Sequence, residues 1–266
     1  MATITVGGVE FGYDETGEGP PVVLVHGALG DRRMWEDPLF TALAKEHRVI
    51  RYDRRGYGES TGGGGAYSHY EDLLALLDSR GIERAALVGS SMGGACSLDA
   101  ALAAPERITR VALLGSGLSG HEWPPHMQAD IVSLTRDVDP GDAVAMAELN
   151  LRYLVVGPDR TPDVLPPGMW ELAREMCEQM YTREASRLQW TENIPETRHR
   201  LGEITTPALV LIGLADASGL IELSAHLAES LPDSKRVDLP DTGHLPQMER
   251  PAEVLSQLQP FLAQDS

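Results

Sequence analysis

The chain has 266 residues, of which 42% are apolar and 23% are charged, as in ordinary soluble globular proteins. These values exclude disorder as the main state, and the length suits one α/β domain with an insertion and a sizeable core. The 22 basic and 40 acidic residues give a net charge of −18, so phosphate backbones and anionic membrane surfaces should repel the protein. We therefore expect neither a nucleic acid nor a membrane as its partner.

The sequence contains no sign of export or of membrane insertion. The two cysteines, Cys96 and Cys177, cannot form a disulfide framework. The chain begins Met-Ala-Thr-Ile-Thr, without the basic start and apolar core of a signal peptide. Apolar runs such as residues 207–212 are far shorter than a membrane-spanning helix. We expect a cytoplasmic protein.

Short apolar runs alternate with helical patterns along most of the chain. In chain order they predict a hairpin (3–6 and 9–14), a strand (22–25), a helix (33–46), a strand (48–52), a helix (67–80), a strand (84–89), a helix (92–104), two strands (110–114 and 208–212), a helix (219–230), a strand (235–239) and a helix (251–263). Strands that alternate with helices predict a mostly parallel central sheet flanked by helices.

The alternation stops between about residues 117 and 203. This segment has helical patterns, is rich in Met, Trp, Leu and Arg, is interrupted by Pro, and contains no predicted strand. It therefore reads as a helical insertion between two strands of the sheet. The predicted organisation is a core domain of residues 1–116 and 204–266 and an insertion of residues 117–203.

The strongest chemical motif is Gly89-Ser90-Ser91-Met92-Gly93, which matches Gly-x-Ser-x-Gly with Ser91 at its centre. A predicted strand leads into the motif and a predicted helix leads out. Such a turn needs close backbone approach on both sides, which glycines permit because they lack a Cβ. Ser91 should then project above the carboxyl edge of the sheet, where open α/β sheets bind ligands. Ser90 is the alternative nucleophile, but the glycines flank Ser91 symmetrically.

A serine nucleophile needs a base, and eight histidines are candidates. His244 follows the last predicted strand, so it should lie at the same edge of the sheet as Ser91. His26 also follows a strand, but it precedes a glycine-rich turn and is assigned a structural role. The other six lie on or beside helical patterns or at the start of the insertion.

The base needs an acid that orients it, and this acid should also follow a strand. Asp216 lies just past the predicted strand 208–212, and the order Ser91, Asp216, His244 is that of one class of triad. Asp238 and Asp241 are closer to His244 in the sequence, but one lies within a strand and the other within a turn.

The oxyanion of a tetrahedral intermediate needs two preorganised donors. The backbone N–H of Met92 follows the nucleophile directly. The second donor should come from the loop after the strand 22–25, and the N–H of Ala28 is our choice. The predicted catalytic set is therefore Ser91, Asp216 and His244, with Ala28 and Met92 as the oxyanion hole.

With these motifs in place, the chain resembles the α/β-hydrolase fold family from about Val9 to Leu262, and especially its small, cofactor-free bacterial members with a helical cap. The motifs that carry the resemblance are His26-Gly27-Ala28, residues 53–60 (Asp-Arg-Arg-Gly-Tyr-Gly-Glu-Ser), the Ser91 turn, Asp216 after Gly213, and Gly243-His244 followed by Glu249 and Pro251. One departure is Ala28-Leu29, where many relatives have a proline soon after the His-Gly pair. The resemblance implies that the insertion is a cap over the Ser91 pocket, and that no metal or cofactor takes part.

The cap contains most of the large side chains that could line a pocket. The candidates for substrate binding are Trp123, Met127, Tyr153, Trp170 and Trp190. Such a lining suits a small or medium apolar group. The alternative interpretation is that these side chains form the core of the cap itself.

The resemblance implies a serine hydrolase, an esterase or lactonase, acting on a small-molecule substrate. A nucleophilic Asp would indicate a dehalogenase or an epoxide hydrolase, and Ser91 argues against both. Two alternatives stay open: a C–C bond hydrolase or lyase with the same triad, and a ligand receptor or carrier with low turnover. A homo-oligomer is compatible with the sequence.

Overall fold

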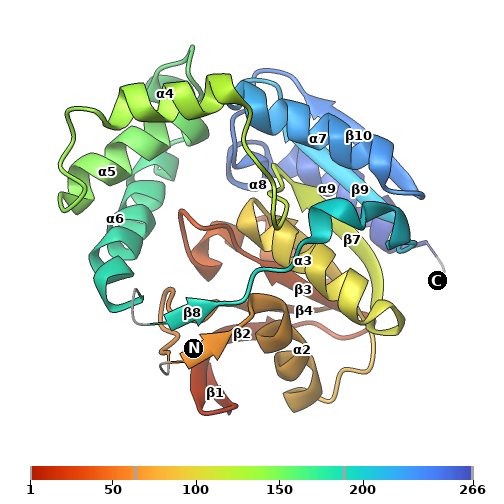
Figure 1. Ribbon diagram of the computed structural model, residues 1–266. Coiled ribbons are helices and arrows are strands. Elements are labelled where there is room, and N and C mark those ends of the chain that lie inside the picture. Colours follow the sequence, from red (N-terminus) through yellow and green to blue (C-terminus); the bar gives the residue numbers. More distant parts are fainter. Residues whose placement is uncertain (1, 63–64, 188–189, 265–266) are drawn as a thin grey trace.

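The computed structural model describes residues 2–62, 65–187 and 190–264, except for the side chains of residues 184–190. Its centre is an eight-stranded sheet with the strand order β1-β2-β4-β3-β6-β7-β9-β10 (Figure 1). The bounds of these strands are β1 Ala2–Val6, β2 Val9–Thr16, β3 Pro21–Val25, β4 Arg48–Tyr52, β6 Ala85–Ser90, β7 Ile108–Leu114, β9 Ala208–Gly213 and β10 Ser234–Leu239. β2 pairs antiparallel with β1 and with β4, and the remaining neighbours pair in parallel, so the predicted mostly parallel sheet is confirmed.

Helices cover both faces of the sheet. Their bounds are α1 Leu39–Leu43, α2 His69–Ser79, α3 Met92–Ala103, α4 Pro125–Thr135, α5 Ala143–Asn150, α6 Met169–Arg187, α7 Ser218–Ser230, α8 Pro246–Glu249 and α9 Pro251–Leu262. Short helical turns are η1 Arg32–Trp35, η2 Pro105–Arg107, η3 Leu151–Val156, η4 Pro162–Val164, η5 Thr197–His199 and η6 Leu201–Glu203. No described helix is both long enough and apolar enough to cross a membrane.

The two faces follow from the alternation of side chains along the strands. In β3, Val23 and Val25 belong to the core beneath α2, α3 and α7, whereas Val22 and Leu24 belong to the core beneath α1 and α9. Because both faces are covered, β3 and β9 are apolar at every position. This buried sheet is the rigid frame on which the loops at its carboxyl edge are placed.

Two local predictions are corrected by the structure. The helix predicted over 33–46 is interrupted, because η1 ends at Trp35 and α1 begins only after Pro38, a residue that lacks a backbone N–H. The segment predicted to lack strands contains β8 (Trp190–Glu192), which pairs in parallel with β5 (Gly65–Tyr67) in a separate two-stranded sheet. Three residues are too few to produce a recognisable alternation.

We keep the name cap for residues 117–203, the division proposed from the sequence. Between β7 and β9 the chain forms α4, α5 and α6, which lie together at one side of the molecule (Figure 1). From β8 onward the chain returns across α3, where Thr197 donates a hydrogen bond to Asp99 at 2.6 Å. The cap helices and this returning segment therefore flank the carboxyl edge of the sheet.

Candidate active site

Ser91 lies on a tight turn between β6 and α3. Its backbone has φ 52° and ψ −121°, a left-handed conformation that is rare for a residue with a side chain. A Cβ on Gly89 would lie 2.4 Å from the Gly93 carbonyl oxygen, and one on Gly93 would lie 2.0 Å from the Val25 carbonyl oxygen. The Leu114 carbonyl accepts the Ser91 N–H at 2.9 Å and holds the turn. The two glycines therefore let the turn press against the sheet and present Ser91 at its carboxyl edge.

His244 and Asp216 lie in the loops that follow β10 and β9. His244 Nδ1 is 2.7 Å from Asp216 Oδ2, and their side chains are 2% and 0% exposed. The other carboxylate oxygen of Asp216 accepts the Ala217 N–H at 2.7 Å. With Nδ1 as the donor, Nε2 is the ring atom that can accept a proton. His244 and Ser91 line the same cavity, so the structure brings all three predicted catalytic residues to one place.

Ala28 and Met92 line this cavity beside Ser91. Met92 is the first residue of α3, so its N–H has no acceptor within the helix. The loop that carries Ala28 is oriented by His26. The His26 Nε2 accepts the Arg54 N–H at 2.9 Å, which leaves Nδ1 to donate to the Gly27 carbonyl at 2.7 Å. His26 thus has the structural position that its sequence context predicts.

Ser90, the alternative nucleophile, lies beneath the turn. It is fully buried, and its hydroxyl accepts a hydrogen bond from Gln247 Nε2 at 3.1 Å. It does not belong to the described lining of the cavity. The geometry therefore favours Ser91 as the group that meets a ligand.

Arg160 from the cap supports the loop that carries His244. Its guanidinium donates to both carboxylate oxygens of Glu249, at 2.7 and 3.0 Å, and to the Asp241 carbonyl at 2.5 Å. The Glu249 side chain is only 2% exposed, and it accepts the Gly243 N–H at 2.8 Å. These contacts fix the residue that precedes His244. The sequence motif contains Glu249, but nothing in it identifies Arg160 as the partner.

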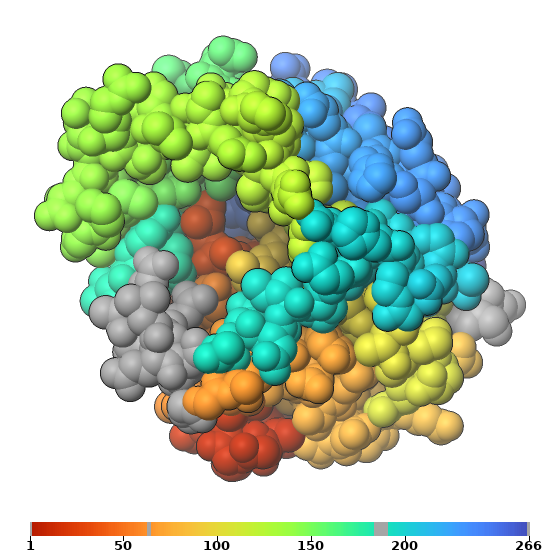
Figure 2. Space-filling view, in the orientation of Figure 1, coloured from red at the N-terminus to blue at the C-terminus, as the bar shows by residue number. Residues whose placement is uncertain are grey.

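The cavity beside Ser91 has a volume of about 400 Å³. Figure 2 shows the molecule hollowed between the green cap helices and the teal segment that begins at β8, with gold atoms of the α3 region in its floor. Most of the remaining lining residues are apolar. The large ones are Leu118, Trp123, Met127, Leu154, Ile194 and Leu220. A cavity of this size and character suits a small or medium apolar group.

The predicted substrate-binding residues separate into three groups. Trp123 and Met127 line the cavity. Tyr153 instead lies in a second hollow within the cap, where its hydroxyl is 3.2 Å from the Asp130 carboxylate. Trp170 packs against the core beneath α1 and α9, so neither Tyr153 nor Trp170 belongs to the described lining of the cavity beside Ser91. The side chain of Trp190 lies outside the described residues.

The polar part of the lining is not evident from the sequence. Ser119 and His121 come from the segment that follows β7, and Glu192 comes from β8. No local pattern marks Glu192, because its strand is short and reaches the cavity only through pairing with β5. His121 lies at the start of the insertion, where the sequence allows a role in the pocket without indicating one, and the structure places it in the lining.

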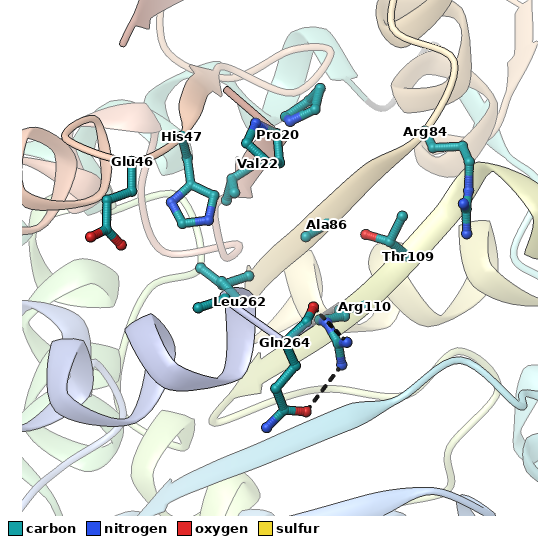
Figure 3. A pocket seen from close by; sticks show the side chains of 12 residues that line it. Pro20, Val22, Glu46, His47, Arg84, Ala86, Thr109, Arg110, Leu262 and Gln264 are labelled. Atoms are coloured by element: carbon teal, nitrogen blue, oxygen red, sulfur yellow. Dashed lines mark hydrogen bonds between the residues drawn. The ribbon is translucent and has the colours of Figure 1, made fainter. Parts of the chain in front are cut away.

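A separate hollow of about 340 Å³ lies at the opposite end of the sheet (Figure 3). It is lined by residues near the amino ends of β3, β6 and β7, such as Val22, Ala86 and Arg110, and by Gln264. Arg110 donates to the Gln264 carbonyl at 2.9 Å. Because ligands of open parallel sheets bind at the carboxyl ends of the strands, we place the candidate active site at Ser91.

Comparisons with known proteins agree with the fold described above. Residues 22–257 match the model of the alpha/beta hydrolase family. Over 250 residues, 92% of this chain, the protein is 34% identical to the dihydrolipoyllysine-residue acetyltransferase component of the acetoin cleaving system of Pseudomonas putida, and the match spans only 64% of that relative.

It is 28% identical over 267 residues to a 2-hydroxy-6-oxononadienedioate/2-hydroxy-6-oxononatrienedioate hydrolase of Paraburkholderia phymatum, a match that covers 95% of this chain and 90% of the relative. The solved enol-lactonase of Burkholderia xenovorans LB400 has a TM-score of 0.76 and 26% identity, and the match covers 99% of this chain and 100% of that one. By its sequence and its fold, the chain belongs to the alpha/beta hydrolase family.

Proposed function

We propose that the protein is a serine hydrolase that cleaves a carboxylic ester or lactone of a small to medium, largely apolar substrate through an acyl-enzyme on Ser91. The observation that carries this proposal is that Ser91 and His244 line one mostly apolar cavity, while Asp216 binds the other ring nitrogen of His244 at 2.7 Å. The similarity to an enol-lactonase supports a substrate with an ester or lactone bond.

The proposed reaction has two halves. His244 Nε2 takes the Ser91 proton as Oγ attacks the carbonyl carbon, and the N–H groups of Ala28 and Met92 stabilise the oxyanion. Asp216 stabilises the imidazolium that forms. The leaving alkoxide then takes the proton from His244 as the ester bond breaks. A water molecule, activated by His244, attacks the acyl-enzyme and releases the acid.

The first test is labelling by a fluorophosphonate probe, with the adduct located by mass spectrometry. We expect an adduct on Ser91 in the wild type and none in the Ser91→Ala variant. Ser90→Ala is the matched control, because it removes the neighbouring hydroxyl and should leave labelling intact. On a panel of esters and lactones, Ser91→Ala should lower kcat by at least about 10⁴-fold. Full turnover by this variant would overturn the proposal.

Hydrolysis of a C–C bond is the second candidate, because the Paraburkholderia phymatum relative is named for a dienedioate. A dioate carries two carboxylates, and the described residues that line the cavity include no Lys or Arg to bind them. This charge pattern favours an ester or lactone. A panel of dienones beside the esters separates the two reactions. Slow turnover with stoichiometric retention of ligand would instead indicate a receptor or carrier.

A further inference from the structure

The cavity beside Ser91 has one acidic wall. Glu192 ends β8, where it pairs with Tyr67 of β5, and its side chain is 29% exposed. Glu192 lines both the main cavity and a small adjoining recess of about 20 Å³, which Asp99 also lines. Glu192 therefore stands where the catalytic cavity continues toward α3.

The side chains that line this wall and its recess include two carboxylates, Glu192 and Asp99. Burial raises the pKa of Asp99 to about 6, and the charge of Glu192 acts in the same direction. No Lys or Arg belongs to the described lining of the cavity. The facing imidazoles are His69, whose Nε2 is 3.8 Å from Glu192, and His121. Burial lowers the pKa of His121, assisted by the charges of His226 and Arg198, which disfavours the charged form of this ring.

Two further polar residues, Ser119 and His121, line this end of the cavity. The Ser119 hydroxyl donates to Asp99 at 2.7 Å, so its oxygen presents lone pairs. The His121 Nε2 has no hydrogen-bond partner among the described residues, and the ring packs edge-on against Trp123 with the centroids 4.9 Å apart. The wall therefore combines the Glu192 carboxylate with a Ser119 hydroxyl whose oxygen can accept a hydrogen bond.

We propose that Glu192 is a specificity-determining residue: it binds a hydroxyl or ammonium group of the substrate and disfavours a carboxylate at the same position. The proposal rests on the proposed ester or lactone hydrolysis and adds the class of substrate. A charged acceptor in a partly buried wall gives short, strong hydrogen bonds to donors, whereas a like charge at the same distance is repelled. The preferred substrate is thus apolar near the reacting bond and carries a donor at its far end.

The test compares p-nitrophenyl esters of equal chain length whose acyl chains end in a methyl, hydroxyl, ammonium or carboxylate group: heptanoate, 6-hydroxyhexanoate, 6-aminohexanoate and the adipate half-ester. A second set carries the same end groups on the alcohol of an acetate ester, for the case in which the alcohol faces Glu192. In at least one set, kcat/KM should be at least about tenfold higher for the hydroxyl and ammonium ends than for the carboxylate end.

Glu192→Gln is nearly isosteric and removes the charge, so it should reduce the ratio of ammonium to carboxylate substrate about fivefold or more. The matched control is Glu222→Gln on α7, which removes a 60% exposed carboxylate outside the cavity and should leave the ratio unchanged. A ratio near one in the wild type, or a ratio that Glu192→Gln does not move, would overturn the role of Glu192.

A binding measurement separates this role from the proposed reaction. In the Ser91→Ala variant, ligand-observed NMR gives the affinities of the same esters without turnover. If the wild type hydrolyses none of the esters, the proposed function fails. The affinity ratios of Ser91→Ala with and without Glu192→Gln then still decide whether Glu192 selects donors.

Discussion

At the scale of single residues, the orientation of His244 depends on one carboxylate. Asp216 accepts the His244 Nδ1–H with one oxygen and the Ala217 N–H with the other, so neither oxygen is free to turn away. An amide in its place would also present an N–H to the ring. The imidazole would then hold its proton on the nitrogen that faces Ser91, and it could not act as a base.

We therefore expect Asp216→Asn to lower kcat on the best ester by about 10³ to 10⁴-fold while the protein stays folded. Steady-state kinetics and urea unfolding measure the two properties. Asp238→Asn is the control, because Asp238 is the alternative acid in the sequence and lies in an exposed pair with Arg236. A large loss with Asp238→Asn and a small loss with Asp216→Asn would reverse the assignment.

The positions of Ser91, Asp216 and His244 could be predicted because each lies a few residues past a strand with a clear apolar pattern. Parallel strands bring such positions to one edge of the sheet, so local sequence patterns were sufficient to predict that these residues lie together. Glu192 could not be predicted in this way. Its position depends on the pairing of β8 with β5, two segments about 125 residues apart that are each three residues long.

At the scale of elements, most strands and helices of the core were predictable from periodicity because they bury one or both faces. The helix predicted over 33–46 failed at Pro38, where α1 begins a new axis after η1. The packing of the cap was not predictable either. Trp123 and Tyr153 line two different hollows, and Trp170 packs against the core beneath α1 and α9. The same helical spacing of apolar residues in the sequence is compatible with each of these positions.

The pair of Arg160 and Glu249 connects the cap to the loop of His244. Arg160→Met leaves a buried carboxylate without its cation, so we expect the free energy of unfolding to fall by about 3 kcal/mol and kcat to fall about tenfold. Urea unfolding and ester kinetics measure both. Adding Glu249→Gln should restore part of the stability, because the unpaired charge is then removed.

Arg152→Met is the control for this experiment. It breaks an exposed pair with Glu148 on the cap, where the arginine side chain is 55% exposed, and such pairs contribute at most about 1 kcal/mol. Equal effects of Arg152→Met and Arg160→Met would contradict a special role for the Glu249 pair.

At the scale of the whole molecule, Asp99 of α3 joins both ends of the cap to the core. It accepts hydrogen bonds from Ser119, at the start of the cap, at 2.7 Å, and from Thr197, near its end, at 2.6 Å. Burial nevertheless raises the pKa of Asp99 from its ordinary value of 3.8 to about 6, because the two hydroxyl donors do not replace the lost water.

This pKa predicts how stability depends on pH. Between pH 4 and 6 the folded protein binds a proton at Asp99 that the unfolded chain releases, so the contribution of this group is greatest below pH 4 and is lost as the pH rises through 6. A shift from 3.8 to about 6 corresponds to about 3 kcal/mol. Asp99→Asn lacks this carboxyl group, so the stability of the wild type relative to this variant should fall by that amount as the pH rises from 4 to 7. Urea unfolding of both proteins at several pH values measures this difference.

Asp78→Asn provides the comparison, because this carboxylate is 65% exposed in its pair with Arg107. It should leave the shape of the pH curve as in the wild type. If Asp99→Asn and the wild type lose stability in parallel between pH 4 and 7, Asp99 is not the group responsible.

The two-stranded sheet of β5 and β8 has a consequence for which substitutions the protein can accept during evolution. Ser91, Asp216 and His244 each follow a strand of the large sheet. Glu192 instead lies in a small sheet that shares no strand with the large one. A mutation at position 192 therefore leaves unchanged the strands that position Ser91, Asp216 and His244. If Glu192 selects the substrate as proposed, natural selection or protein engineering can change substrate preference at position 192 while Ser91, Asp216 and His244 keep their positions.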